Sequence, residues 1–378
     1  MSAPIVKGPI IQGWCPGAHR PMVSGDGLVV RVRPWLGQIT ARQATALCDV
    51  AMRFGTGTLE LTSRANLQIR GVAASDHAAV IATLQTANLL DTDPAAEGRR
   101  NLLMTPDWTH GDDTHRLATA LMRTLSSLPV LPAKFGYAVD TGSEPWLIGA
   151  PADIRLERGA VGTLILVADG ADAGRAVTFA SALDALQEMV AWFVETGGRE
   201  AGRMARHLRN RTLPAEWTRA TRRVMTPNRH TNGTLLGVPF GQLDVGVFKD
   251  TMARNVIEEL RILPGRRLLV MGASIAIPDG FCAPGDPLHD VHACTGAPGC
   301  PQAFGPTRTT ARALAASLPR GKVLHVSGCT KGCAHPHAAD YTLIATKDGF
   351  DLVSKGAPWD APTKRGLPFD LTFKDIQT

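Results

Sequence analysis

The spacing of apolar residues changes several times along the chain, and each change marks the boundary of a predicted helix or strand. Residues 27–34 alternate between apolar and polar side chains, as a half-buried strand does. Residues 40–54 then follow the spacing of an amphipathic helix, with Cys48 on its apolar face. Two short alternating segments follow, at residues 58–62 and 66–70. The pattern therefore predicts the order strand, helix, strand, strand.

The same order returns in the second half of the chain. It predicts a strand, a helix and two more strands at residues 233–239, 248–260, 267–271 and 274–277. A Gly-Gln pair follows the first strand of each copy, as Gly37-Gln38 and Gly241-Gln242. We interpret the recurrence as an internal duplication, with chance similarity as the alternative because the identities are few.

Two further units complete the chain. Between the copies, we expect helices near residues 76–89, 113–127 and 174–196. We expect strands near residues 134–140 and 161–168. After the second copy, we expect a helix and two strands at residues 309–318, 323–326 and 341–346. The two related halves are predicted at residues 1–75 and 226–285. An α/β domain is predicted at residues 76–225, and a final domain, which carries the cysteine pairs described below, at residues 286–378.

Composition narrows the class of protein. A chain of 378 residues exceeds one compact core and predicts several domains. No apolar run approaches the roughly 18 residues that a membrane span needs. The net charge of +6 is modest, and the basic residues are dispersed among few aromatics, which argues against nucleic-acid binding. The first residues lack the apolar core of an export signal, so we expect a cytoplasmic protein whose thiols stay reduced.

Four cysteines near the C-terminus carry the strongest chemical signal. Cys294 and Cys300 form a Cys-x5-Cys pair, and Cys329 and Cys333 form a Cys-x3-Cys pair. Both pairs lie in segments rich in glycine and proline, which can wrap closely around a bulky centre. Four thiolates on such loops are typical of a [4Fe–4S] cluster. The alternatives are structural zinc, which favours shorter gaps, two disulfides, or unliganded buried cysteines.

Cations and amides alternate along the predicted strands of the first half. Such a polar strand face is not core, so it is either solvated or binds a polyanion. Because the arginine fork suits carboxylates, we interpret the set as clamps for a polycarboxylate. The predicted binding residues are Arg31, Arg33, Arg64, Gln68, Arg70, Arg100 and Lys134.

These motifs together resemble the sirohaem-dependent sulfite and nitrite reductase superfamily. The resemblance rests on the motifs Thr62-x-Arg64-x-x-x-Gln68-x-Arg70-Gly71, Arg100-Asn101 and Leu131-Pro-x-Lys134-Phe135, and on the four cysteines. The resemblance implies an α+β fold of the nitrite/sulfite reductase type. Its duplicated ferredoxin-like halves form one domain, and two α/β domains complete a central tetrapyrrole crevice beside the cluster. It also implies that Cys333 bridges the cluster to a sirohaem iron.

One position departs from that pattern. The reductases continue as Lys-Phe-Lys, whereas this chain reads Lys134-Phe135-Gly136 and lacks a second ammonium for a small anion. Other stretches resemble a narrower family, the precorrin-3B synthases, which hydroxylate precorrin-3A with O2 at C20 and close a γ-lactone. The stretches that resemble this family are Gly13-Trp14-Cys15-Pro16-Gly17, Arg20-Pro21-Met22, Ser24-Gly25-Asp26-Gly27 and the segments 293–301 and 327–336.

This second resemblance implies a mononuclear non-haem iron in addition to the cluster. His335 and His337 share one face of an extended segment and are the predicted catalytic residues, with Asp340 and His292 as further ligand candidates. No dinucleotide or flavin motif is present, so a separate ferredoxin or flavin reductase is expected to deliver electrons from NADH. A sirohaem reductase and a zinc-stabilised binding protein remain the alternative functions.

Overall fold

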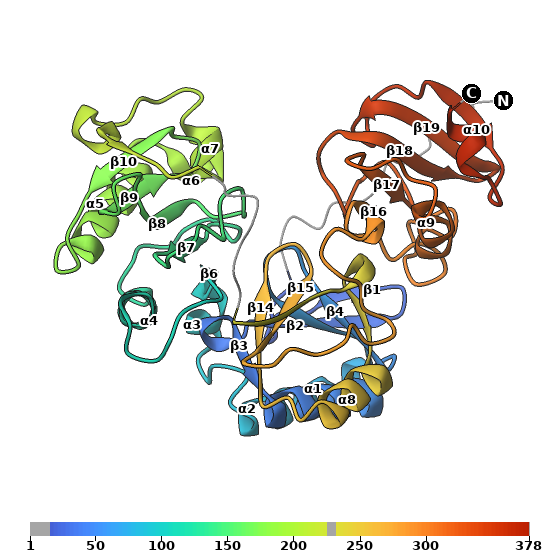
Figure 1. Cartoon of the computed structure of the whole chain (residues 1–378), viewed down its shortest axis with the longest axis horizontal. Coiled ribbons are helices and arrows are strands. Elements are labelled where there is room, and N and C mark those ends of the chain that lie inside the picture. The colour runs from blue at the N-terminus through green and yellow to red at the C-terminus, as the bar shows by residue number, and fades with distance from the viewer. Residues whose placement is uncertain (1–15, 225–231, 378) are drawn as a thin grey trace.

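The structure is a computed structural model that describes residues 16–224 and 232–377. Three lobes, each with its own hydrophobic core, make up the molecule (Figure 1). The predicted Gly13-Trp14-Cys15 signature lies outside the described residues. None of the helices in the described ranges is long and apolar enough to cross a membrane.

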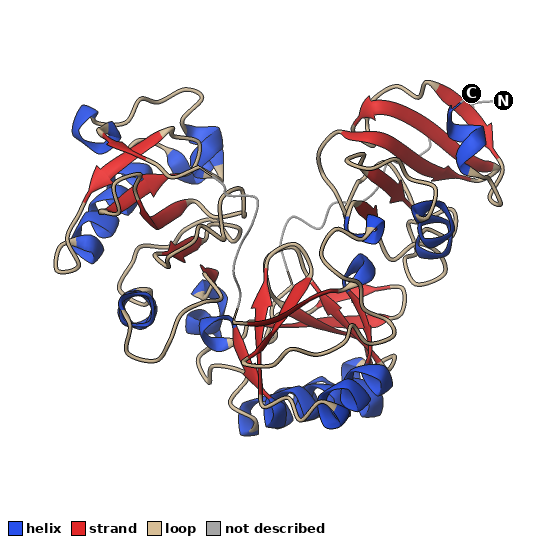
Figure 2. Cartoon of the chain, viewed as in Figure 1, coloured by secondary structure: helices blue, strands red, loops and turns tan. Residues whose placement is uncertain are grey.

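The first lobe consists of the two related halves. The first half contains β1 (Met22–Ser24), β2 (Gly27–Val32), β3 (Gln38–Thr40), α1 (Ala41–Phe54), β4 (Thr58–Leu61), β5 (Leu67–Val72) and α2 (His77–Thr86). The second contains β12 (Gly233–Gly237), β13 (Gln242–Asp244), α8 (Val245–Arg254), β14 (Glu259–Leu263) and β15 (Arg267–Met271). The strand orders are β1-β2-β5-β4-β13 and β12-β15-β14-β3, so each half lends one strand to the sheet of the other. Helices α1, α2 and α8 pack together along one side of this double sheet (Figure 2).

Backbone details support the duplication. Each copy has a short 3-10 turn after its first long strand, at Trp35–Gly37 and Pro239–Gly241. Its central residue, Leu36 or Phe240, has a left-handed conformation with φ of 51° or 57°. Non-glycine residues seldom adopt this conformation, and its recurrence at matching places indicates a shared ancestral turn.

The prediction for the second copy was wrong in two elements. Residues 248–260 were expected to be one helix, but α8 ends at Arg254 and Glu259–Leu263 forms β14. Residues 274–277 do not form a strand; the second hairpin is β14–β15. The mixed apolar and charged segment from Ile257 to Leu263 is too short for its period to distinguish a helix from a strand. Pairing of β14 with β3 and β15 decides the outcome.

The second lobe holds a mixed sheet in the order β11-β10-β9-β8-β7-β6. Its elements are α3 (Pro94–Arg99), β6 (Leu102–Met104), α4 (Asp113–Thr124), β7 (Tyr137–Asp140), β8 (Ile154–Arg158), β9 (Leu164–Ala168), β10 (Ala173–Ala176), α5 (Ala182–Glu195), α6 (Gly198–Ala201), α7 (Met204–His207) and β11 (Ala220–Thr221). The helix expected over 174–196 begins only at Ala182, because β10 pairs with β9 and β11. Helix α2, expected in this lobe, packs into the core of the first one through Val80 and Leu84.

The third lobe holds a five-stranded sheet. Its elements are β16 (Val291–Ala293), α9 (Arg308–Ala315), β17 (Leu324–Ser327), β18 (Ala339–Thr346), β19 (Gly349–Gly356), β20 (Lys364–Leu367) and α10 (Phe373–Gln377). Strands β16, β17 and β18 are parallel neighbours. The loops that leave β16 and β17 start at the same edge of the sheet, and each carries one cysteine pair.

At Arg70 the polar strand face of the first half is neither solvated nor open to a ligand. Arg70 is only 9% exposed, and its guanidinium forms a fork with Asp26, at 2.9 and 3.0 Å. Glu60 lies between Arg70 and Arg308, and Arg308 begins α9 of the third lobe. The face is therefore a buried ion-pair network that joins the first lobe to the cysteine-bearing one.

We expect Glu60→Gln to lower the free energy of unfolding by about 3 kcal/mol, because it removes the carboxylate that pairs Arg308 and one of the two that pair Arg70. Denaturant unfolding at neutral pH measures the change. Asp49→Asn is the matched control, since Asp49 pairs with Lys249 on the surface and should cost less than about 1 kcal/mol. Equal effects of the two substitutions would contradict the role given to Glu60.

Candidate functional site

A cavity of about 810 Å³ opens where the three lobes meet. Its wall includes five cationic side chains and no aspartate or glutamate among the described residues. Two of the cations, Arg64 and Arg266, come from the first lobe, and the other three, Lys134, Arg203 and Arg206, come from the second. Such a wall is favourable for a ligand that carries several negative charges.

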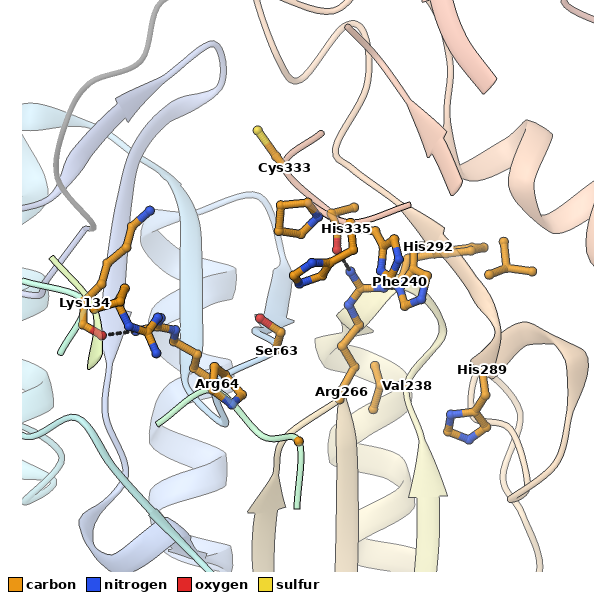
Figure 3. A pocket seen from close by; sticks show the side chains of 18 of the residues that line it. Ser63, Arg64, Lys134, Val238, Phe240, Arg266, His289, His292, Cys333 and His335 are labelled. Atoms are coloured by element: carbon orange, nitrogen blue, oxygen red, sulfur yellow. Dashed lines mark hydrogen bonds between the residues drawn. The ribbon is translucent and has the colours of Figure 1, made fainter. Parts of the chain in front are cut away.

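Two hairpin tips of the duplicated lobe meet at this cavity. Arg64 lies in the turn between β4 and β5, and Arg266 lies in the turn between β14 and β15. The tips touch, because the Gly265 amide donates to the Ser63 carbonyl at 3.4 Å. The internal duplication thus places one arginine from each half at the same cavity (Figure 3).

Backbone carbonyls of the other lobes fix both arginines. Arg64 donates from Nη1 to the carbonyl of Lys134 at 2.9 Å. Arg266 donates from Nη2 to the carbonyl of Ala334 at 3.1 Å, and its Nη1 lies 3.4 Å from Nδ1 of His292. Burial lowers the pKa of Arg266 to about 10, helped by the nearby charge of Arg308, yet the group stays protonated at neutral pH.

Imidazole rings form the part of the cavity wall next to Arg266. His292 on β16 stacks on His335, with ring centroids 4.3 Å apart, and His335 contacts His337 at 5.6 Å. His325 on β17 is fully buried and lies 5.7 Å from His335, and neither of its ring nitrogens has a hydrogen-bond partner among the described residues. Burial lowers the pKa of His292 to about 2 and of His325 to about 3, so both rings are neutral at physiological pH.

The structure brings together the two predicted catalytic residues but not the expected iron ligand set. His335 and His337 line the cavity. Asp340, the expected carboxylate ligand, instead accepts from Lys322 Nζ and the Val323 amide, each at 2.9 Å. Imidazole nitrogens suit iron, but no three such side chains in the described part of the chain converge on one ion. We therefore assign no step to a mononuclear iron.

The four predicted cluster cysteines gather at the edge of the third lobe. Cys294 and Cys300 lie on the loop after β16, and Cys329 and Cys333 lie on the loop after β17. The four are free thiols. Burial raises the pKa of Cys329 and of Cys333, and the other cysteines raise it further, because their charges act on one another at close range.

This arrangement fits a [4Fe–4S] cluster. In such a cluster each thiolate binds a different iron, so the four sulfurs need not converge on one point as zinc ligands do. The Gly328 amide already donates to Sγ of Cys294 at 3.2 Å, a type of contact that stabilises thiolates. A Cβ at Gly328 would lie 2.6 Å from Ala303 and 3.4 Å from that sulfur, so glycine is required for the close approach. Cys333 also lines the cavity, so a cluster held by these four cysteines would lie beside it.

Of the predicted binding residues, Arg64 and Lys134 line the cavity and the other five do not. Arg33 and Arg100 both pair with the buried Glu97, and Arg100 also stacks on Trp35 at 3.7 Å. Arg31 donates to Gln68 at 2.9 Å when the Gln68 amide is oriented to satisfy both groups. Arg70 belongs to the ion-pair network described above.

Sequence reasoning missed three cations of the cavity, Arg203, Arg206 and Arg266. A signal existed for one of them. Had the second hairpin been placed at β14–β15, Gly265-Arg266 would have aligned with Ser63-Arg64 of the first copy. For Arg203 and Arg206 the sequence offers only a segment with several arginines, and the fold alone selects which of them reach the cavity.

Comparison with known proteins decides the family. The nitrite/sulfite reductase ferredoxin-like half domain matches residues 20–87. A precorrin-3B synthase of Sinorhizobium sp is 30% identical over 395 residues, which cover 93% of this chain and 84% of that protein. The chain belongs to the precorrin-3B synthase family. This membership makes it an enzyme of the oxidoreductase class with a role in cobalamin biosynthesis.

Two more distant relatives confirm the superfamily and the fold. A ferredoxin–nitrite reductase of Synechococcus elongatus is 23% identical and covers 88% of this chain and 79% of its own length. The structure of Mycobacterium tuberculosis NirA protein superposes with a TM-score of 0.63 at 18% identity, over 90% of this chain and 77% of that one. The predicted α+β, nitrite/sulfite reductase-like fold is confirmed.

We expect Cys329→Ser to lose most of the bound iron and acid-labile sulfide, because one corner of the cluster has no thiolate. Iron and sulfide assays and the visible absorption spectrum measure the loss. Cys48→Ala is the control, since Cys48 is buried on α1 among the apolar residues of the first lobe. Full iron and sulfide content in Cys329→Ser would refute the cluster assignment.

Proposed function

We propose that this enzyme converts precorrin-3A to precorrin-3B in the cytoplasm, where reducing conditions keep its cluster thiols available. The reaction hydroxylates the macrocycle at C20 with O2, and the ring A acetate closes a γ-lactone. The observation that carries the proposal is the cavity wall of five cations without a carboxylate. Family membership supplies the substrate class that fits it, a tetrapyrrole with many carboxylates.

The electrons and atoms of this reaction balance with an external reductant. One atom of O2 enters the product, and the other leaves as water after taking up two electrons and two protons. NADH is the proposed source of the electrons, delivered through a ferredoxin or flavin reductase. Cys294, Cys300, Cys329 and Cys333 would hold a [4Fe–4S] cluster beside the cavity, which Cys333 lines, and such a cluster would supply one-electron transfer there.

The residues of the cavity take distinct roles in this proposal. Arg64 and Lys134 bind substrate carboxylates, for which guanidinium and ammonium groups are suited. His335 and His337 are the proposed catalytic residues and contact the reacting edge of the macrocycle, where an imidazole can donate or accept a proton. The neutral rings of His292 and His325 support His335 from behind.

Gly136, which stands where the reductases have a second lysine, supports conversion of precorrin-3A over sulfite or nitrite reduction. A Cβ on Gly136 would lie 3.0 Å from the Asn101 carbonyl, so a lysine there requires Asn101 to move. A sirohaem-dependent reductase, the second candidate, is tested by the same assay. It predicts sulfite or nitrite reduction and no oxygen transfer to precorrin-3A.

The direct test is turnover of precorrin-3A under ¹⁸O2 with NADH and a reductase. We expect one labelled oxygen in the product, read by mass spectrometry, and a lactone visible by infrared or NMR spectroscopy. An unlabelled product, or a protein that reduces sulfite and leaves precorrin-3A unchanged, would contradict the proposal.

We expect Arg64→Ala and Lys134→Ala each to raise the KM for precorrin-3A by about 10-fold or more, because each removes a charged hydrogen bond of about 1.5–3 kcal/mol. Steady-state kinetics measure the change. Arg123→Ala is a control for the loss of one positive charge on an exposed helix position outside the cavity. An unchanged KM in both cavity variants would refute their role in binding.

A further inference from the structure

A second group of cations lines the cavity wall that the second lobe supplies. Arg203 and Arg206 flank the start of α7, after the turn that ends α6 at Gly202. Lys134, on the loop before β7, belongs to the same wall. None of the assigned binding roles uses the two arginines.

A buried carboxylate holds this wall together. Asp153 is completely buried and precedes β8. Its Oδ1 accepts from Arg203 Nε and from the Met204 amide, each at 2.8 Å, and its Oδ2 accepts from the Gly136 amide at 2.9 Å. One carboxylate therefore links the start of α7 to the backbone two residues beyond Lys134.

The hydrogen bonds of Arg203 leave part of its guanidinium available. Its Nε is bound to Asp153, and within the described residues its two terminal amino groups have no partner. Arg206 likewise has no side-chain partner among those residues. Terminal amino groups are the fork with which arginine binds a carboxylate. An arginine whose Nε is fixed from behind is therefore already oriented for a ligand carboxylate.

We propose that Arg203 and Arg206 form a second carboxylate subsite, and that Asp153 is the residue that positions it. The ligand is one carboxylated edge of the macrocycle, bound opposite the wall of histidines. The inference rests on the proposed function for the identity of the ligand, a polycarboxylated tetrapyrrole. It adds the orientation of that ligand, with a carboxylated edge toward the second lobe and another edge toward His335 and His337.

The test measures binding of uroporphyrin, a stable tetrapyrrole with carboxylates on every ring, by fluorescence titration of the intact protein. We expect Arg206→Gln to weaken binding about 10-fold. Arg209→Gln is the matched control: it lies three residues further on, is exposed like Arg206 and does not line the cavity. It should leave affinity unchanged.

Asp153 is tested through its coupling to Arg203. We expect Asp153→Asn to weaken uroporphyrin binding in the parent protein, and to have little further effect in an Arg203→Gln background. A purely structural role for Asp153 would weaken binding equally in both backgrounds. That result would overturn its assignment as a positioning residue, and circular dichroism of each variant reports whether the fold is retained.

The outcomes separate this inference from the proposed function. If the unmodified protein does not bind uroporphyrin, the tetrapyrrole assignment and the subsite both fail. If it binds, and Arg206→Gln matches Arg209→Gln, the subsite alone is wrong and the tetrapyrrole assignment stands.

Discussion

The excess of positive charge in the wall of the central cavity is the constraint on which the rest of the structure depends. Five cations face a shared space without a carboxylate among its described lining residues. Like charges at such close quarters repel one another, and the repulsion is relieved only when an anion binds. The fold offsets this repulsion by hydrogen-bonding three of the cations to fixed groups of the protein. Carbonyls hold Arg64 and Arg266, and the buried Asp153 holds Arg203.

Arginines outside the cavity, in the same lobes, form ion pairs with buried glutamates. Arg33 and Arg100 share Glu97, and Arg70 shares Glu60 with Arg308. These guanidinium groups are buried and paired with carboxylates, and they join elements or whole lobes. The structure therefore uses arginine in two ways. Outside the cavity the arginines hold the protein together, whereas Arg203 combines an ion pair to the buried Asp153 with a place in the cavity wall.

The sequence was sufficient for most elements and insufficient for the cavity. Cysteine spacing and glycine-rich loops are local, so the sequence alone predicts Cys294 and Cys329 as cluster ligands, and that assignment stays a prediction. The burial of Arg70 could not be predicted, because Glu60 and Arg308 come together only through the packing of separate lobes. Residues 259–263 were misjudged because a short segment of mixed apolar and charged residues has no decisive period, and with that strand the pseudo-symmetric Arg266 was lost.

The central claim is that the cavity receives a tetrapyrrole as substrate and does not retain one as a cofactor. The most direct measurement is an anaerobic visible spectrum of the purified protein, with extraction of any pigment and counts of iron and acid-labile sulfide. The account predicts broad iron–sulfur absorption, sulfide in the ratio of a [4Fe–4S] cluster, and no extractable macrocycle. Stoichiometric sirohaem with sharp bands in the red would contradict it and make the protein a sulfite or nitrite reductase.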